Sequence, residues 1–190
     1  MLNKYIVLFL FFTAVALPLQ AEEYAIDKKG THAFIQFKIK HLGYSWLYGR
    51  FNDFSGRFSY DEKNPSTANV TVDINPASVD SNHAERDKHL RGEDFLFVDK
   101  YPTAKFVSTA YQKQGEGKGT LKGDLTLRGV TKSVQIDVEH IGHGKDPWGG
   151  YRRGLFGTTE ISLADFGVPF DLGPASKTVQ LELSIEGIRQ

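Results

Sequence analysis

The sequence predicts an all-β protein of about eight antiparallel strands with one short helix. Stretches in which apolar and polar residues alternate follow one another along the chain, as expected for strands with one buried face. Glycine, asparagine, aspartate and proline separate these stretches, which is typical of turns, and short turns join antiparallel neighbours. Both a closed barrel and a sandwich are consistent with this pattern, since each buries one face of every strand.

The clearest strand is predicted at Ala33–Lys40, where Ala33, Ile35, Phe37 and Ile39 face one way and the polar residues between them face the other. Such a strand is half-buried, with its apolar face towards the core. The same pattern predicts further strands at Arg50–Tyr60, Val70–Ile74, Ala104–Tyr111, Gly119–Leu127, Val134–Glu139, Tyr151–Leu163 and Val179–Glu186.

Two hairpin turns and one helix complete the predicted elements. Gln114–Gly117 and Arg128–Thr131 are predicted to be hairpin turns, because glycine adopts the positive φ that such turns require. Asn82–Gly92 has an N-cap residue at Asn82, an acid three positions later and a glycine at its end, which together predict a short helix. The helix contains few apolar residues, so we expect it to be a lid or connector across one opening of the sheet.

The first 21 residues have the features of a secretory signal peptide. Lys4 precedes the apolar run Tyr5–Leu17, and Pro18 and Ala21 follow it. The run is shorter than the roughly 20 apolar residues of a membrane-spanning helix, which argues against an uncleaved anchor. We therefore expect residues 1–21 to be removed after Ala21 and residues 22–190 to be exported as a single domain.

Composition excludes several classes of partner. The chain has no cysteine, so the fold cannot depend on disulfides. Its 23 Lys and Arg residues balance 23 Asp and Glu residues, whereas nucleic-acid binding depends on an excess of clustered positive charge. No general attraction to anionic membranes follows from such a balance either. We expect no nucleic-acid partner and no stable membrane insertion.

The sequence contains no complete set of catalytic or metal-binding residues. Gly43–Leu47 lacks the second glycine of a hydrolase nucleophile turn. His83 and His89 lie about 240° apart around a helix, so they cannot share one metal ion. His140 and His143 lack a third ligand at a typical spacing. We therefore expect no catalytic residues, no metal ion and no cofactor.

Aromatic residues are concentrated in three segments, His41–Phe51, Phe95–Phe97 and Asp146–Tyr151. A single ring most often only caps the core, but loops are usually polar, so three aromatic segments favour the mouth of an apolar pocket. His41 and Arg86 are candidates to hydrogen-bond a polar head group. The predicted cavity or mouth residues are Ile35, Phe37, Ile39, Leu42, Trp46, Phe51, Phe106 and Phe156.

Several longer motifs point to a known family. They are His41–Ser45 with Gly49 and Phe51, Val79–Leu90, Lys100–Pro102, Gly123–Lys132 and Asp146–Gly150. Over essentially the whole chain after the signal peptide, the sequence resembles the YceI-like family, periplasmic proteins of lipocalin-like fold associated with polyisoprenoid binding. Tyr151–Arg153 is bulkier and more basic than the family pattern leads us to expect, a difference that would alter the mouth.

The resemblance implies an extended, eight-stranded, antiparallel lipocalin-like barrel in the periplasm. Its interior would hold a long isoprenoid, such as a prenyl phosphate or a quinone-like lipid, with the tail inside and the head near the mouth. Homodimers are also associated with the family. The leading hypothesis is thus a periplasmic binding or carrier protein that performs no chemistry on its ligand.

Two alternatives belong to other functional classes. One is an enzyme acting on an isoprenoid or envelope lipid, with the helix between His83 and Arg91 as its polar site. The other is a periplasmic interaction module whose barrel interior is fully packed by side chains. A continuous internal cavity would distinguish the binding protein from the packed module.

Overall fold

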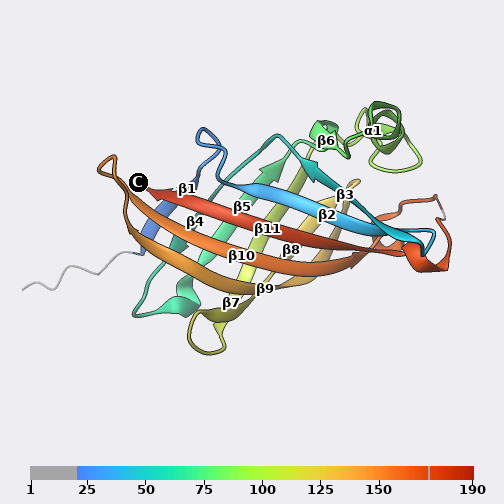
Figure 1. Ribbon diagram of the computed structural model, residues 1–190. Helices are drawn as coiled ribbons and strands as arrows, with labels where there is room; N and C mark the ends of the chain where they lie inside the picture. Colours follow the sequence, from blue (N-terminus) through green and yellow to red (C-terminus); the bar gives the residue numbers. More distant parts are fainter. Residues whose placement is uncertain (1–20, 171) are drawn as a thin grey trace, which may run out of the picture.

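The computed structural model describes residues 21–170 and 172–190 and shows a closed antiparallel β-barrel accompanied by one α-helix within that part of the chain (Figure 1). Residues 1–20, which make up nearly all of the predicted signal peptide, lie outside the described residues. No helix among the described residues is long and apolar enough to cross a membrane.

Eleven strand segments form the sheet. They are β1 (Glu22–Ile26), β2 (Phe34–His41), β3 (Ser45–Phe51), β4 (Phe54–Tyr60), β5 (Asn69–Ile74), β6 (Val79–Asp80), β7 (Ala104–Lys113), β8 (Lys118–Leu127), β9 (Val130–Lys145), β10 (Tyr151–Ser162) and β11 (Thr178–Arg189). The helix α1 spans Ala84–Arg91, and short 3₁₀ turns occur at Pro65–Thr67, Pro76–Ser78, Ala164–Phe166 and Pro174–Ser176.

The eleven segments occupy eight positions around the barrel, which confirms the predicted fold class. The pairing of β11 shows how this arises: Leu183 lies opposite Ile35 of β2, and Gly187 lies opposite Ile26 of β1. The segments β1 and β2 therefore lie end to end along the same edge of β11. In the same way β4 and β3 share one position, and β5 and β6 share the next. The pairing of β1 with β11 closes the barrel.

Alternation of side chains explains why β2 forms a wall of the barrel. Ile35 and Ile39 are buried, whereas Gln36 and Lys40 are exposed. The same alternation was predicted from the sequence, and the other predicted strands also occur, with ends that differ by a few residues. The predicted strand Arg50–Tyr60 is wrong in one respect, because Asn52 and Asp53 interrupt it between β3 and β4.

The predicted hairpin turns are present. Arg128 and Gly129 join β8 to β9 with φ values of 51° and 73°, and two consecutive positive φ values define the type I′ turn that matches the twist of a hairpin. Gln114–Gly117 joins β7 to β8, with Gly117 at a φ of 68°. Both turns connect strands that pair antiparallel, as their sequences predicted.

The helix α1 lies within the predicted segment, but its N-cap is His83 and not Asn82. Asn82 has a φ of 63°, and its backbone N–H donates to Asp80 Oδ1 at 2.9 Å. His83 Nδ1 accepts the N–H of Arg86 at 3.2 Å, so the imidazole caps the helix instead. In Figure 1, α1 lies at one end of the barrel near β3 and β6.

One arginine joins three segments at the other end of the barrel. Arg152 on β10 donates to Asp27 Oδ2 at 2.7 Å, to Asp146 Oδ2 at 2.8 Å and also to Glu186. Burial by itself would raise the pKa of Asp27, but hydrogen bonds from Arg152, the Gly30 N–H and His32 lower it to about 2. Asp27 is therefore ionised and buried beside its counter-charge.

Replacing Arg152 with methionine should lower the free energy of unfolding by about 3 kcal/mol at pH 7, because Asp27 is then buried without a counter-charge. Urea unfolding measures this loss. Arg189→Met is the matched control, since it removes only the half-exposed ion pair with Glu22, and it should cost less than about 1 kcal/mol. Equal losses in the two variants would contradict the role given to Arg152.

The same ion cluster predicts a dependence on acid. The folded pKa of Asp27, about 2, is below its ordinary value of 3.8. The stabilisation is thus complete above pH 3.8 and is lost as the pH falls towards 2. Wild type should lose stability over this interval, and Asp27→Asn should lose less. Parallel stability curves for the two proteins would contradict the assignment.

Candidate ligand-binding site

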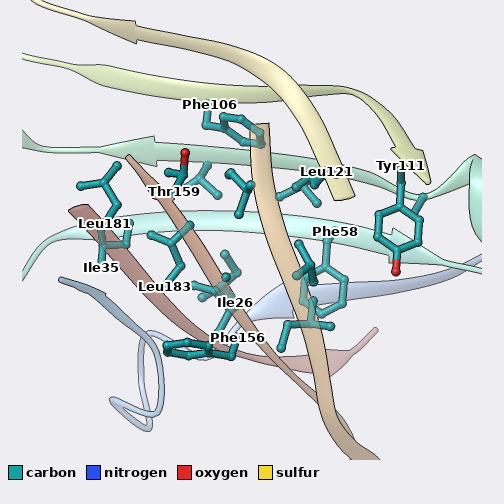
Figure 2. Close-up of a pocket in the computed structure, with 18 of the residues that line it drawn as sticks. Ile26, Ile35, Phe58, Phe106, Tyr111, Leu121, Phe156, Thr159, Leu181 and Leu183 are labelled. Carbon is teal, nitrogen blue, oxygen red and sulfur yellow. The ribbon is translucent and has the colours of Figure 1, made fainter. Parts of the chain in front are cut away.

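The barrel interior is hollow and consists of two adjoining chambers. The outer chamber, of about 480 Å³, lies at the end of the barrel where α1 and the β2–β3 turn are found. The inner chamber, of about 140 Å³, lies deeper between the strands (Figure 2). Ile35, Ile74, Leu125 and Leu181 belong to the walls of both chambers, so the two chambers lie next to each other, and together they are called the tunnel below. The packed interior expected for an interaction module is not what the structure has.

The walls of both chambers are overwhelmingly apolar. Val72, Leu121 and Ile136 line the inner chamber, and Leu47 and Val179 line the outer one. Burying each methylene group of a ligand against such walls contributes about 0.8 kcal/mol. A volume of a few hundred cubic ångströms is also within the usual range of small-molecule sites. The tunnel is therefore suited to a long hydrocarbon chain.

The structure brings most of the predicted site residues to this tunnel. Ile35, Phe37, Ile39, His41, Leu42, Phe51 and Arg86 line the outer chamber. Phe106 and Phe156, again with Ile35, line the inner chamber. Alternation along β2 explains four of the first group, Ile35, Phe37, Ile39 and His41, because every second residue from Ile35 faces inwards.

Trp46 is the exception, because it lines neither chamber. It is 43% exposed, and it lies opposite Lys40 on the neighbouring strand. The ammonium groups of Lys38 and Lys40 lie 5.5 and 5.4 Å from the centroid of its ring. The residue after it, Leu47, points into the outer chamber instead. Trp46 therefore lies on the face of β3 directed away from the chambers.

Four aromatic rings in the tunnel wall lie against glycines of other strands. The pairs are Phe37 with Gly49, Phe58 with Gly187, Phe106 with Gly123 and Tyr111 with Gly119. At Gly49 an added Cβ would lie 2.2 Å from the Phe37 ring, and all three of its nearest neighbours would be atoms of that ring. The missing Cβ gives each ring space against the wall. The rings therefore line the barrel without filling its centre.

The outer chamber ends near residues with substantial exposure. Leu42 is 57% exposed and Phe170 is 41% exposed, and both line the outer chamber, so we take the mouth of the tunnel to lie near them. Arg86 is next to this mouth, but Nε of its guanidinium donates to Ser81 Oγ at 2.8 Å, and an Nη donates to the Ser81 carbonyl. His41 is exposed. The two predicted head-group residues thus lie at the same end of the tunnel.

The predicted aromatic segments do not all reach this mouth. Phe95 and Leu96 line the outer chamber. Trp148 is 77% exposed, and its ring lies 5.4 Å from the guanidinium of Arg152 in the cluster with Asp27. The Asp146–Tyr151 segment therefore belongs to the opposite end of the barrel.

A buried charge that sequence reasoning missed lies at the inner end of the tunnel. The Arg153 residue is 1% exposed. It donates to the Glu62 carboxylate and to His140 Nδ1, the latter at 3.3 Å, and its guanidinium lies 4.5 Å from the centre of the Tyr60 ring. By the alternation of side chains along β10, Arg153 lies on the same face as Gly157 and Ile161. This pattern was the signal in the sequence that Arg153 faces inwards.

The cluster of Arg153, Glu62 and His140 at this inner end has no net charge at neutral pH. The hydrogen bond from Arg153 lowers the pKa of Glu62 below its ordinary value of 4.5. Burial first, and then the charge of Arg153, lower the pKa of His140 below 6.5. At neutral pH the cluster thus combines one cation, one carboxylate and a neutral imidazole.

One group of the described residues has side chains suitable for metal binding, although the sequence led us to expect no metal ion. The ligand atoms of Asp27, His32 and Glu186 lie within 4.8 Å of one another. Arg152 donates hydrogen bonds to both carboxylates, so its positive charge already occupies the position of a cation. We assign this cluster a structural role.

Comparison with known proteins identifies the family. Residues 24–187 match the YceI-like domain. The chain belongs to the YceI-like family. A UPF0312 protein of Ectopseudomonas mendocina is 62% identical over 170 residues, which cover 90% of this chain and 89% of that protein.

Solved structures of YceI-like barrels agree with the fold. The YceI protein of Campylobacter jejuni is 31% identical, covers 80% of this chain and 91% of its own, and superposes with a TM-score of 0.72. A domain from Saccharophagus degradans, described as a polyisoprenoid binding domain, is 16% identical with a TM-score of 0.62, over 88% of this chain and 98% of its own. This second likeness shows the shared fold.

Gly49→Ala should weaken the binding of an apolar probe by roughly tenfold, because the new methyl group pushes the Phe37 ring into the outer chamber, and overpacking usually costs 1–3 kcal/mol. Titration with N-phenyl-1-naphthylamine, which fluoresces in apolar surroundings, measures the affinity. Gly142→Ala is the control, since nothing lies within 4 Å of its added Cβ. Unchanged affinity in a folded Gly49→Ala protein would show that the ring does not limit the chamber.

Proposed function

We propose that this YceI-like protein is a periplasmic binding or carrier protein for a long apolar amphiphile, a polyisoprenoid such as a prenyl phosphate or a quinone-like lipid. The apolar tunnel inside the barrel is the observation that carries the proposal. The hydrocarbon chain lies along the two chambers and is shielded from water. The S. degradans domain, whose description includes polyisoprenoid binding, supports this ligand class.

In this proposal the predicted cavity residues contact the ligand chain. Phe37, Phe51 and Leu42 hold the part in the outer chamber, and Phe106 and Phe156 hold the part in the inner chamber. Trp46 is not part of the proposed site. Arg86 and His41 stay in it as residues at the mouth, where they meet whichever end of the ligand lies there.

Binding without catalysis is favoured by the roles of the polar residues in and around α1. His83 caps the helix. The buried carboxylate of Asp87 accepts hydrogen bonds from the N–H of Ser81, at 2.8 Å, and from its hydroxyl. These side chains hold the helix and the loop before it together. The helix therefore has a sufficient structural reason for its polar residues, and an enzymatic role is not needed to explain them.

The location and assembly of the protein are part of the proposal. The signal peptide predicted at residues 1–21 directs the chain to the periplasm, and residues 22–190 form one domain. In that compartment a carrier can take a water-insoluble lipid from one membrane and release it to another. Because homodimers are associated with the YceI-like family, a homodimer is the assembly to test. Nucleic acid is not a partner in this proposal.

Protein purified from the periplasm should carry a lipid in its tunnel, and mass spectrometry of an organic extract should detect it. Leu125→Trp should reduce the amount severalfold, because Leu125 belongs to both chambers and an indole there blocks their junction. Asp124→Trp is the matched control, since Asp124 is exposed on the same strand.

Three outcomes of this experiment lead to different conclusions. Lipid in wild type and Asp124→Trp but not in Leu125→Trp supports the proposal. Lipid in equal amounts in all three proteins places it outside the tunnel, and repeated absence of lipid from wild type contradicts the carrier function. Circular dichroism of each variant establishes that the barrel is folded.

A further inference from the structure

The inner end of the tunnel contains a polar atom whose hydrogen-bonding capacity is unused. Among the side-chain atoms of the described residues, the hydroxyl of Tyr111 is fully buried and has no hydrogen-bond partner. The residue is 7% exposed and belongs to the wall of the inner chamber. Figure 2 shows its ring inside the barrel, at the end of the chamber away from Ile35 and Leu181. A buried hydroxyl left unpaired is costly, at about 1–3 kcal/mol.

Other polar residues line the same chamber. The Tyr60 ring lies 6.2 Å from the Tyr111 ring and 4.8 Å from the imidazole of His140. Tyr60, His140 and Arg153 belong to the wall of the same chamber. An arginine can only donate, so His140 Nδ1 accepts from Arg153, and the neutral imidazole carries its proton on Nε2. The inner end is thus rich in donors, whereas the rest of the tunnel is apolar.

Charge pairing decides which kind of ligand atom suits this end. Arg153 is paired with Glu62, and nearby Arg189 is paired with Glu22 at 2.7 Å. Burial raises the pKa of Tyr111 above 10, so its hydroxyl is protonated and available to donate. Among the residues that line this chamber Arg153 is the cation, and Glu62 already neutralises its charge, so a phosphate would gain little attraction here. An uncharged oxygen needs only a donor, and Tyr111 supplies one.

We propose that the inner end of the tunnel is a subsite for an uncharged oxygen of the ligand head, a carbonyl of the quinone or amide class, which accepts a hydrogen bond from the Tyr111 hydroxyl. This inference rests on the proposed binding function and specifies its head group. The ligand enters head first through the mouth near Leu42, and its tail extends back through the outer chamber. This orientation is opposite to the one expected from the family resemblance.

Tyr111→Phe tests the subsite, because it removes the hydroxyl and keeps the ring over Gly119. The variant loses no hydrogen bond within the protein, so it should fold as well as wild type. Displacement of N-phenyl-1-naphthylamine measures affinity for two uncharged probes, decylubiquinone, which has carbonyl oxygens, and undecylbenzene, which has none. Tyr111→Phe should weaken decylubiquinone by about three- to tenfold and leave undecylbenzene within twofold.

Two further measurements complete the test. Tyr48→Phe is the matched control, because Tyr48 is 57% exposed and lines neither chamber, and it should leave both affinities unchanged. In infrared spectra, a carbonyl band of bound decylubiquinone should lie at lower frequency in wild type than in Tyr111→Phe. The anionic probe farnesyl phosphate should bind wild type more weakly than decylubiquinone does.

The possible failures are distinguishable. If undecylbenzene binds but decylubiquinone is insensitive to Tyr111→Phe, the subsite is wrong and the proposed apolar binding stands. If farnesyl phosphate binds most tightly and loses affinity in Arg86→Ala, the head lies at the mouth and the inferred orientation is overturned. If none of the probes binds, both the subsite and the proposed function fail.

Discussion

The interior of this barrel depends on the close approach of aromatic rings to glycines on other strands of the sheet. Protein interiors are normally packed to crystal-like density, and in a barrel of eight strands inward-pointing side chains are large enough to fill the space. Here Phe37, Phe58, Phe106 and Tyr111 lie against the wall because Gly49, Gly187, Gly123 and Gly119 have no Cβ to hold them away. The rings therefore cover the inner wall of the barrel, and its centre remains open for a chain-like ligand.

The two ends of the tunnel differ in chemistry because neighbouring residues of β10 face opposite sides of the barrel. Arg152 joins β1, the β9–β10 loop and β11 through carboxylates outside the tunnel. Arg153 points inwards and brings donors to the end of the inner chamber. The ion cluster outside one end of the barrel and the polarity of the inner end of the tunnel thus come from two consecutive arginines of β10.

Much of the fold was predictable because it depends on local patterns. Alternation in β2 predicts which residues line the tunnel, and the Arg128–Gly129 turn predicts the β8–β9 hairpin. The side of β3 on which Trp46 lies was not predictable from the sequence, because an aromatic ring fits either face, and it follows instead from the pairing with Lys40. Asn82 was misjudged as the N-cap because its neighbour His83 can also accept the required hydrogen bond.

The contacts that make the site special depend on register, which the sequence does not reveal. Phe106 lies over Gly123 because β7 and β8 pair with Phe106 opposite Leu125, and Tyr111 lies over Gly119 because the register shifts between Ser108 and Ala110. The inward position of His140 likewise depends on the bulge where β9 meets Gly154 and Leu155. Such pairings join residues far apart in the chain, so composition and periodicity indicate an apolar pocket without giving its length or its polar end.

The most direct test of this account is a crystal structure of the protein purified from the periplasm with its native content. We predict continuous, elongated electron density that runs from the mouth near Leu42, past Leu125, to the hydroxyl of Tyr111. A structure in which the rings of Phe37 and Phe106 turn inwards and fill both chambers would contradict it.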